Sequence, residues 1–316
     1  MTSVTFQGIL SARRVVGQFL QPTPLIHYPE LSERFGFHAY VKHENHLPTG
    51  CFKVRGGLNF MHHFTGEMRG VVTATRGNHG QSIAYAAGKF GAKATVVVPH
   101  GNNPEKNSAM RAYGAELIEH GVDFDEAREL CETLQAERGL YYVHPCLEPA
   151  LFHGVGTYSL EIFERLPNVD AIIVPIGGGS GVCGAITVAN AINPAVEVIG
   201  VQAENAPAIY LSWKKGRPVQ TESAETMADG LATRVPFALP FSLIKDGIDD
   251  IVLLSEAELR EGIRLALRYT HNLAEGAGAS PIAAAHKLTE RLAGKHVVMV
   301  MSGGNVDAAT LKSVLA

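Results

Sequence analysis

The sequence predicts an α/β protein with two domains, each containing a mostly parallel, twisted sheet flanked by helices. Three observations predict this: short strands that are apolar on both faces, helical segments that alternate with them, and glycine-rich turns where several strands end. Strands buried on both faces are typical of parallel sheets covered by helices. A chain of 316 residues is long enough for two such domains.

The predicted strands are short runs of apolar, mainly β-branched residues. The chain before them opens with a helical pattern within residues 1–36, and Pro22 and Pro24 then impose an extended path. The strands are predicted over residues 39–42, 71–74, 94–99, 116–118, 141–143, 170–175, 196–201 and 296–301.

Helical patterns separate these strands, and local signals mark several of their ends. Gly91 closes one helix, and Pro104 suits the first turn of another. Ser255 forms a capping box with Glu258, three positions further on. The helices are predicted over 79–90, from Pro104, over 123–137 and from Ser255 to about 270.

Composition excludes several classes of protein. The formal net charge of −4 gives no electrostatic reason to expect nucleic acid or an anionic membrane as a partner. The four cysteines are widely spaced without a CxxC pair, so neither a zinc site nor a disulfide framework is indicated. Residues 1–6 lack the pattern of a signal peptide, and no apolar stretch is long enough to span a bilayer. We therefore expect a soluble, cytoplasmic protein.

The most informative stretch is Thr49–Gly57, in which Lys53 directly follows Phe52 in what we expect to be a short, glycine-flanked turn. A lysine amine becomes a nucleophile for aldehydes when desolvation or a nearby cation lowers its pKa. The alternative is an ordinary solvated lysine that pairs with a carboxylate. Three further stretches downstream favour the first interpretation.

These three stretches are glycine turns at the ends of predicted strands, where open parallel sheets bind their ligands. They cover residues 75–81, 177–181 and 302–305. The run at 177–181 lacks the P-loop lysine and the dinucleotide fingerprint, but its backbone N–H groups can converge on an anion at a helix start. A tight structural turn is the alternative. Together with Lys53, the turns call for a ligand with an aldehyde, a flat ring and a phosphate, as pyridoxal phosphate has.

The same four motifs carry a resemblance to a known family. In chain order they are Thr-Gly-Cys-Phe-Lys-Val-Arg-Gly, Gly-Asn-His-Gly, Gly-Gly-Gly-Ser-Gly and Ser-Gly-Gly-Asn. This order resembles the fold-type II pyridoxal-phosphate enzymes, whose fold is like that of the tryptophan synthase β chain, and is most similar to the threonine/serine dehydratase and serine racemase group. The resemblance covers nearly the whole chain. We accordingly assign residues 1–60 and 149–316 to a large cofactor-binding domain and residues 61–148 to a small substrate-side domain.

The resemblance implies roles for individual residues. Lys53 is the Schiff-base lysine and the base at the substrate α-carbon, and Phe52 packs on one face of the ring. Asn78 hydrogen-bonds the ring hydroxyl, and Ser302 faces the pyridine nitrogen. The phosphate is held by Gly177, Gly178, Gly179, Ser180 and Gly181, and the substrate carboxylate by Thr75 and His79 with neighbouring N–H groups.

A serine opposite the ring nitrogen makes the ring a weaker electron sink than a carboxylate would, which favours rapid loss of a β leaving group. The expected reaction is β-elimination of water from a 3-hydroxy amino acid (threonine, serine, or the 3-hydroxyaspartate or 3-phenylserine type), giving a 2-keto acid and ammonia. The alternatives are a racemase or β-replacement enzyme, a Rossmann-type nucleotide-binding protein without this cofactor, and a catalytically silent homologue.

The sequence departs from the family pattern at three positions. Cys51 stands where the family usually has serine, and Ser180 replaces a fourth glycine. Arg76 occupies the position at which serine racemases carry a serine acid/base. Because arginine stays protonated, racemisation is disfavoured. One hypothesis is that Arg76 recognises an anionic or polar group on the substrate; the alternative is that it turns to solvent or pairs with a protein carboxylate.

The remaining expectations rest on resemblance. Related enzymes hold a divalent cation near the position of Glu204 and the Ala208 carbonyl, but Tyr210 stands where a second carboxylate is expected, and a hard cation needs several oxygen ligands. A homodimer is implied. Since the last predicted strand is followed by few residues before Ala316, feedback control through a carboxy-terminal domain is not expected.

Overall fold

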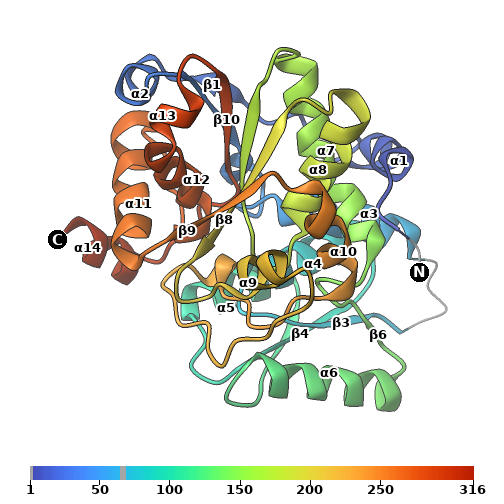
Figure 1. Cartoon of the computed structure of the whole chain (residues 1–316). Coiled ribbons are helices and arrows are strands. Elements are labelled where there is room, and N and C mark those ends of the chain that lie inside the picture. The colour runs from blue at the N-terminus through green and yellow to red at the C-terminus, as the bar shows by residue number, and fades with distance from the viewer. Residues whose placement is uncertain (1–2, 65–68) are drawn as a thin grey trace.

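The computed structural model describes residues 3–64 and 69–316, and its elements form two β-sheets with helices packed around them (Figure 1). Met1 and Thr2, at the start of the segment without a signal-peptide pattern, and residues 65–68 of the predicted small domain lie outside the described residues. The predicted fold class is confirmed. No helix in the described part of the chain combines the length and the apolar character that crossing a membrane requires.

The larger sheet has six strands in the order β1-β2-β10-β7-β8-β9. All neighbouring strands are parallel except β1 and β2, which are antiparallel. The strands are β1 (Leu25–His27), β2 (His38–His43), β7 (Ala171–Pro175), β8 (Glu197–Ala203), β9 (Asp250–Leu254) and β10 (His296–Met301).

The smaller sheet has four parallel strands in the order β5-β4-β3-β6. They are β3 (Val71–Ala74), β4 (Ala94–Val98), β5 (Glu116–Glu119) and β6 (Tyr141–Tyr142). All eight predicted strands therefore occur, with small differences at their ends, whereas β1 and β9 were not predicted.

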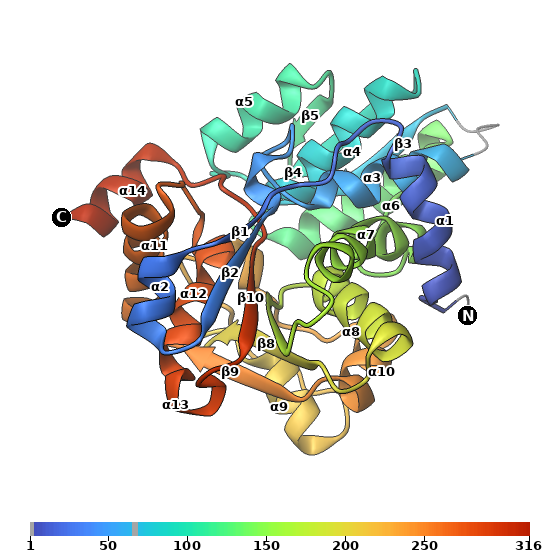
Figure 2. The same cartoon turned by 90° about the horizontal axis from the view of Figure 1, so that it is seen from above.

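Helices cover both faces of the larger sheet. In Figure 2 its strands β1, β2 and β10 run between α2, α11 and α12 on one side and α1, α7 and α8 on the other. Alternate residues of β7 belong to the two separate apolar cores on these faces: Ile172 and Val174 to one, Ala171 and Ile173 to the other. The helices are α1 (Phe6–Val16), α2 (Pro29–Phe35), α3 (Lys53–His63), α4 (Asn78–Lys89), α5 (Pro104–Ala112), α6 (Phe124–Arg138), α7 (Pro149–Arg165), α8 (Ser180–Ile192), α9 (Ala208–Lys215), α10 (Ala238–Gly247), α11 (Glu256–Thr270), α12 (Gly276–Lys287), α13 (Thr289–Leu292) and α14 (Ala308–Leu315), with 3₁₀ turns η1 (Glu44–His46) and η2 (Asp229–Leu231).

One local prediction is wrong: Lys53 does not lie in a turn but is the first residue of helix α3. Gly56 and Gly57, two of the glycines that suggested a turn, lie inside this helix, where they allow close packing, whereas Gly50 lies before it with a φ of +64°. A Cβ at Gly56 would lie 2.7 Å from the Leu151 carbonyl oxygen of α7, and one at Gly57 would lie 2.4 Å from Ser82 Oγ of α4. These glycines therefore let α3 pack between helices that belong to different sheets.

The predicted boundary at residue 60 falls within α3, and the boundary at 149 coincides with the start of α7. The six-stranded sheet draws its strands from residues 25–43 and 171–301, and the four-stranded sheet from residues 71–142. The division into two domains, with its limits, stays a prediction.

A buried ionic network anchors the first turn of α3. The Arg55 guanidinium donates to both carboxylate oxygens of Glu44, at 2.6 and 2.9 Å, and to both of Glu161, at 2.7 and 2.9 Å. The ammonium of Lys42 donates to Glu161 at 2.5 Å and to the Thr23 carbonyl at 2.9 Å. Two cations thus offset two carboxylates in a region closed to water, which joins β2, η1, α3 and α7.

We predict that Arg55→Met destabilises the protein strongly, because it leaves Glu44 and Glu161 buried without their shared cation. Loss of one partner of a buried ion pair costs about 3–5 kcal/mol, which urea unfolding measures as a lower midpoint. Arg13→Gln is the matched control: the partly exposed Arg13 also contacts Glu161, at 3.2 Å, and pairs with Glu164 at the surface, at 3.0 Å, and ion pairs that reach solvent contribute roughly 1 kcal/mol or less. Equal effects of the two substitutions would contradict this account.

Candidate active site

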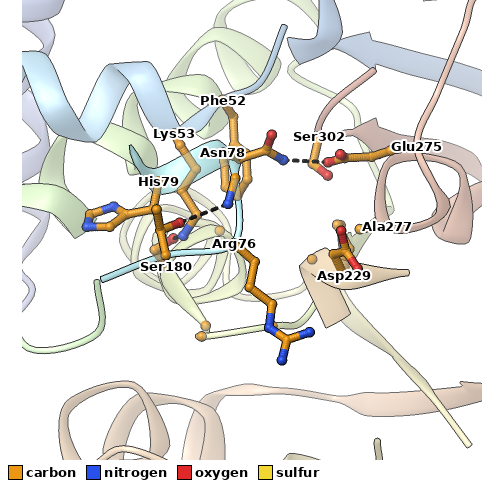
Figure 3. Close-up of a pocket in the computed structure, with 18 of the residues that line it drawn as sticks. Phe52, Lys53, Arg76, Asn78, His79, Ser180, Asp229, Glu275, Ala277 and Ser302 are labelled. Atoms are coloured by element: carbon orange, nitrogen blue, oxygen red, sulfur yellow. Dashed lines mark hydrogen bonds between the residues drawn. The ribbon is translucent and has the colours of Figure 1, made fainter. Parts of the chain in front are cut away.

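A cavity between the two sheets brings together all four stretches that the sequence singled out (Figure 3). Every residue predicted to bind cofactor or substrate lines it: Phe52, Lys53, Thr75, Arg76, Asn78, His79, Gly177, Gly178, Gly179, Ser180, Gly181 and Ser302. Seven further residues line the cavity. Gly77 and Pro175 belong to the predicted glycine turn and strand, whereas five residues had not been expected there: Lys106, Asp229, Gly230, Glu275 and Ala277.

Lys53 is held at both ends. The Ser82 hydroxyl of α4 donates to its backbone carbonyl at 2.6 Å, and its own Nζ donates to Ser180 Oγ of α8 at 2.9 Å. The Nζ atom also lies 5.4 Å from the centroid of the Phe52 ring. The amine is thus directed into the cavity next to the glycine loop that follows β7 (Figure 3).

In the loop at 177–181, the glycines pack so closely against neighbouring segments that side chains would not fit. A Cβ at Gly177 would lie 2.0 Å from the Gly230 carbonyl oxygen, and one at Gly178 would lie 2.5 Å from Cys146 Sγ. Gly179 has a φ of +93° and caps the amino terminus of α8, which has 13 residues. The positive end of the helix and the first-turn N–H groups therefore face the cavity as an anion site.

A second helix start, that of α4, faces the same cavity. The Thr75 hydroxyl accepts the Gly77 N–H at 3.0 Å and so stabilises the turn before Asn78. The His79 ring is buried and donates from Nε2 to the Val143 carbonyl at 3.3 Å. Burial, together with the Lys53 charge, lowers the pKa of His79 to about 3. The ring is therefore neutral and points away from the cavity, so its backbone N–H is the group suited to a carboxylate.

Asn78 is fixed by two neighbours. Its Nδ2 donates to Glu275 Oε1 at 2.7 Å, and its Oδ1 accepts from Asn305 Nδ2 at 2.7 Å. Ser302 lies at the end of β10, where its carbonyl accepts the Phe52 N–H at 3.0 Å. Within residues 3–64 and 69–316, its hydroxyl has no hydrogen-bond partner, which leaves that group available to a ligand atom.

Lys106 joins the two sides of the cavity. Its Nζ pairs with Asp229 Oδ2 at 2.6 Å, which links α5 beside the small sheet to η2 beside the large one. Burial lowers the pKa of Lys106, but the Glu275 and Asp229 carboxylates outweigh it and raise this pKa overall. Glu275 is buried as well, and burial raises the pKa of its carboxyl group although Lys106 and Asn78 oppose the shift.

Arg76 is exposed at the edge of the cavity and also lines the neighbouring, larger cavity that contains His100 and Asp307. In Figure 3 its guanidinium points away from Asn78 and Ser302. It has no ion pair with any residue that the structure describes. The pairing half of the alternative therefore finds no support in the described residues, whereas the exposure of Arg76 fits the half in which it turns to solvent, and its role stays a prediction.

The candidate cation residues lie away from this cavity, at the end of β8 and the start of α9. Glu204 is exposed, and the Ala208 carbonyl accepts the Ser212 hydroxyl at 2.6 Å. No group of three or more His, Cys, Asp or Glu side chains in the described part of the chain is arranged to hold a metal ion. A cation site there stays a prediction.

Cys51, the departure next to Phe52, is buried and forms an isolated antiparallel bridge with Gly303. Burial raises the pKa of its thiol, so the group is neutral. Cys51 therefore serves as a small apolar residue that supports the Lys53 and Ser302 segments.

These residues fit pyridoxal phosphate. The amine of Lys53 suits its aldehyde, the loop at 177–181 at the start of α8 suits its phosphate, and the hydroxyl of Ser302 suits the ring nitrogen. Fold and site together define an enzyme class that uses this cofactor. The chain indeed belongs to the pyridoxal-phosphate dependent enzyme family, whose model matches residues 16–303, and this confirms the resemblance stated above.

Individual relatives and solved structures show which members of this family the chain is similar to. The chain is 42% identical over 296 residues to an L-threonine ammonia-lyase of Geobacter sulfurreducens, a match that covers 93% of this chain and 73% of the relative. Among solved structures it is similar to the processed form of threonine deaminase isoform 2 from Solanum lycopersicum, with a TM-score of 0.93, 31% identity and coverage of 98% and 87% of the two chains. It is also similar to maize serine racemase, with a TM-score of 0.93, 27% identity and coverage of 99% and 97%.

We predict that Glu275→Gln makes the protein without cofactor more stable than the wild type, and increasingly so as the pH rises. A carboxyl group whose pKa is raised by folding binds its proton more tightly in the native state. The wild type therefore loses stability as the pH rises through that raised pKa. Glutamine has no proton to lose, so the variant keeps its stability, and its side-chain oxygen can still accept the hydrogen bond from Asn78. Urea unfolding at about pH 5 and about pH 8 measures the difference. The exposed Glu30→Gln is the control, and a pH-independent effect of Glu275→Gln would contradict the prediction.

Proposed function

We propose that this protein is a pyridoxal-phosphate-dependent ammonia-lyase that eliminates water from a 3-hydroxy amino acid, threonine or serine; the enamine formed then takes up water and yields the 2-keto acid and ammonia. The observation that carries the proposal is the convergence of the Lys53 amine, the glycine cradle at 177–181 and the Ser302 hydroxyl on one cavity. The 42% identity to an L-threonine ammonia-lyase supports the substrate class.

When bound, the cofactor supplies an aldehyde carbon that joins to amines and a ring that accepts electrons from the substrate α-carbon. Of the two lysines that line the cavity, Lys106 is paired with Asp229 and stays charged. Among the described residues, the Lys53 amine donates only to the Ser180 hydroxyl, and we assign it as the nucleophile. Once the substrate amine has taken its place, the Lys53 Nζ removes the α-proton and holds it.

The remaining groups bind and orient. We assign the substrate carboxylate to the first-turn N–H groups of α4, at Asn78, His79 and Gly80, with the Thr75 hydroxyl holding that turn in shape. The phosphate belongs at the start of α8 and the ring hydroxyl at Asn78. Ser302 offers the ring nitrogen a neutral hydroxyl. A neutral hydroxyl stabilises negative charge on the ring less than a charged partner would. The β-hydroxyl is therefore expected to leave soon after the α-proton is removed.

Arg76 remains the candidate for substrate selection. Its charge is not offset by an ion pair within the described residues, and it lines the same cavity as Lys53. We propose that it favours substrates whose β-substituent is anionic or polar. As a permanently protonated group it cannot exchange protons with the α-carbon, so the racemase alternative lacks its second acid/base.

Assays of 2-keto acid release test the proposed function across serine, threonine, 3-phenylserine and both 3-hydroxyaspartate diastereomers. We expect release from serine or threonine by the cofactor-loaded wild type and none by Lys53→Ala. Arg76→Ala is expected to lower the relative rate with 3-hydroxyaspartate; an unchanged preference would exclude that role. Appearance of D-serine without keto acid would favour the racemase instead.

The location, assembly and ion content of the protein are further proposals. We propose that the protein is cytoplasmic and forms a homodimer. Light scattering on the purified protein tests the dimer, and the mass of a single chain would contradict it. Glu204 and the Ala208 carbonyl remain the candidate cation ligands, and full activity after exhaustive chelation would exclude a required divalent ion.

A further inference from the structure

We propose that Ser180 is a positioning residue for the catalytic lysine: its hydroxyl holds the Lys53 amine whenever that amine is not joined to the cofactor. This inference rests on the proposed function of Lys53. It goes beyond the phosphate contact expected of this loop, because it gives Ser180 a role in proton transfer at the substrate α-carbon.

The geometry fixes the hydroxyl group more firmly than the amine. Ser180 is 2% exposed and is the first residue of α8, whose start is set by Gly179 and by the Cys183 N–H, which donates to the Gly179 carbonyl at 3.0 Å. Lys53, by contrast, has a flexible four-carbon stem. With the backbone of Lys53 held by Ser82 and its Nζ held at 2.9 Å by Ser180, the whole side chain is stretched between two helices that flank different sheets.

Other groups near the amine cannot replace this contact. The Phe52 ring centroid is 5.4 Å away. His79 donates its ring N–H to Val143. Burial raises the pKa of the Cys146 thiol to about 11, although the Lys53 charge lowers it, so that group is neutral. Within the described residues, Ser180 is the one side chain to which Lys53 Nζ donates a hydrogen bond.

A hydroxyl at this position does what glycine cannot. It has two lone pairs and one O–H, so it can accept from the Lys53 ammonium while it donates its own hydrogen to an anion in the cradle. After Lys53 has taken the α-proton, the ammonium is therefore held at the cradle and kept from the α-carbon. This arrangement opposes return of the proton to the α-carbon and favours elimination.

The test compares Ser180→Gly, which restores the residue expected from the family pattern, with Ser180→Ala, which suits a helix better. We expect kcat for threonine to fall about tenfold in both, a fraction of the roughly 10²–10⁴-fold that a general base contributes. The isotope effect on kcat with α-deuterated threonine should fall, since the proton returns to the α-carbon more readily and loss of the β-hydroxyl then limits the rate more than proton removal does. Thr187→Ala is the control, because in the described part of the chain the Thr187 hydroxyl donates only to the Cys183 carbonyl within the same helix.

A role confined to phosphate binding or to folding would weaken cofactor affinity or stability and leave the isotope effect unchanged; that result overturns the proposal.

A second readout does not need turnover. Stopped-flow absorbance follows capture of pyridoxal phosphate by the protein prepared without it, at saturating cofactor. We expect severalfold slower capture in both Ser180 variants than in Thr187→Ala, and equal rates would count against Ser180. Failure of the proposed function shows separately, as absent keto acid release by a wild type that captures the cofactor normally.

Discussion

The buried network around Arg55 is the constraint on which the rest of this structure depends. Arg55 and Lys42 lie with Glu44 and Glu161 out of contact with water. Burial raises the pKa of Glu161, but Arg55 and Lys42 outweigh it and lower this pKa overall, so the carboxylate stays ionised. Charges buried in this way contribute less to stability than apolar packing of the same volume would. What the network provides is position, because it joins α3 to β2, η1 and α7 in one geometry.

That position matters because Lys53 begins α3, two residues before Arg55. The network fixes the first turn of the helix from one side, and the packing of Gly56 and Gly57 against α7 and α4 fixes it from the other. The amine then needs only a partner at its free end, which Ser180 supplies. An amine on a flexible stem is in this way attached to rigid elements of both sheets.

The two sheets also meet across the opening of the cavity. Lys106 and Asp229 connect α5 to η2, and Asn103 of the small-sheet side donates to Asp307 at 3.0 Å. Asn78 connects α4 to Glu275, which precedes α12. The space between the helix starts of α4 and α8 is thus bordered by polar contacts that run between the sheets.

Much of this could be predicted from the sequence because the signals are local. Apolar runs, caps and glycine turns mark the strands and the ligand loops, and the twelve predicted lining residues all reach the cavity. Lys106 and Asp229 could not be found in this way, because they are 123 positions apart and only the tertiary fold joins them. The only local hints in the sequence were turn-forming residues, the Asp229-Gly230 pair and the small residues after Glu275, which indicate loops but not their place at the cavity. The helix at Lys53 was missed because glycines that serve helix packing look like glycines of a turn.

The side-chain directions were the other limit. Periodicity places His79 at the start of a helix, but it does not reveal that the ring turns to Val143 and leaves the backbone N–H for the ligand. Likewise, the glycine pattern identified Ser180 as a departure without indicating that its hydroxyl meets Lys53. Such contacts depend on how α3, α4 and α8 approach one another.

The most direct test of the central claim is borohydride reduction of the protein loaded with pyridoxal phosphate, followed by mass analysis of its peptides. Reduction makes the link between the cofactor and its lysine permanent. The account predicts a single pyridoxyl group, on the peptide that contains Lys53. A label on Lys106 or on another lysine, or no label at all, would contradict it.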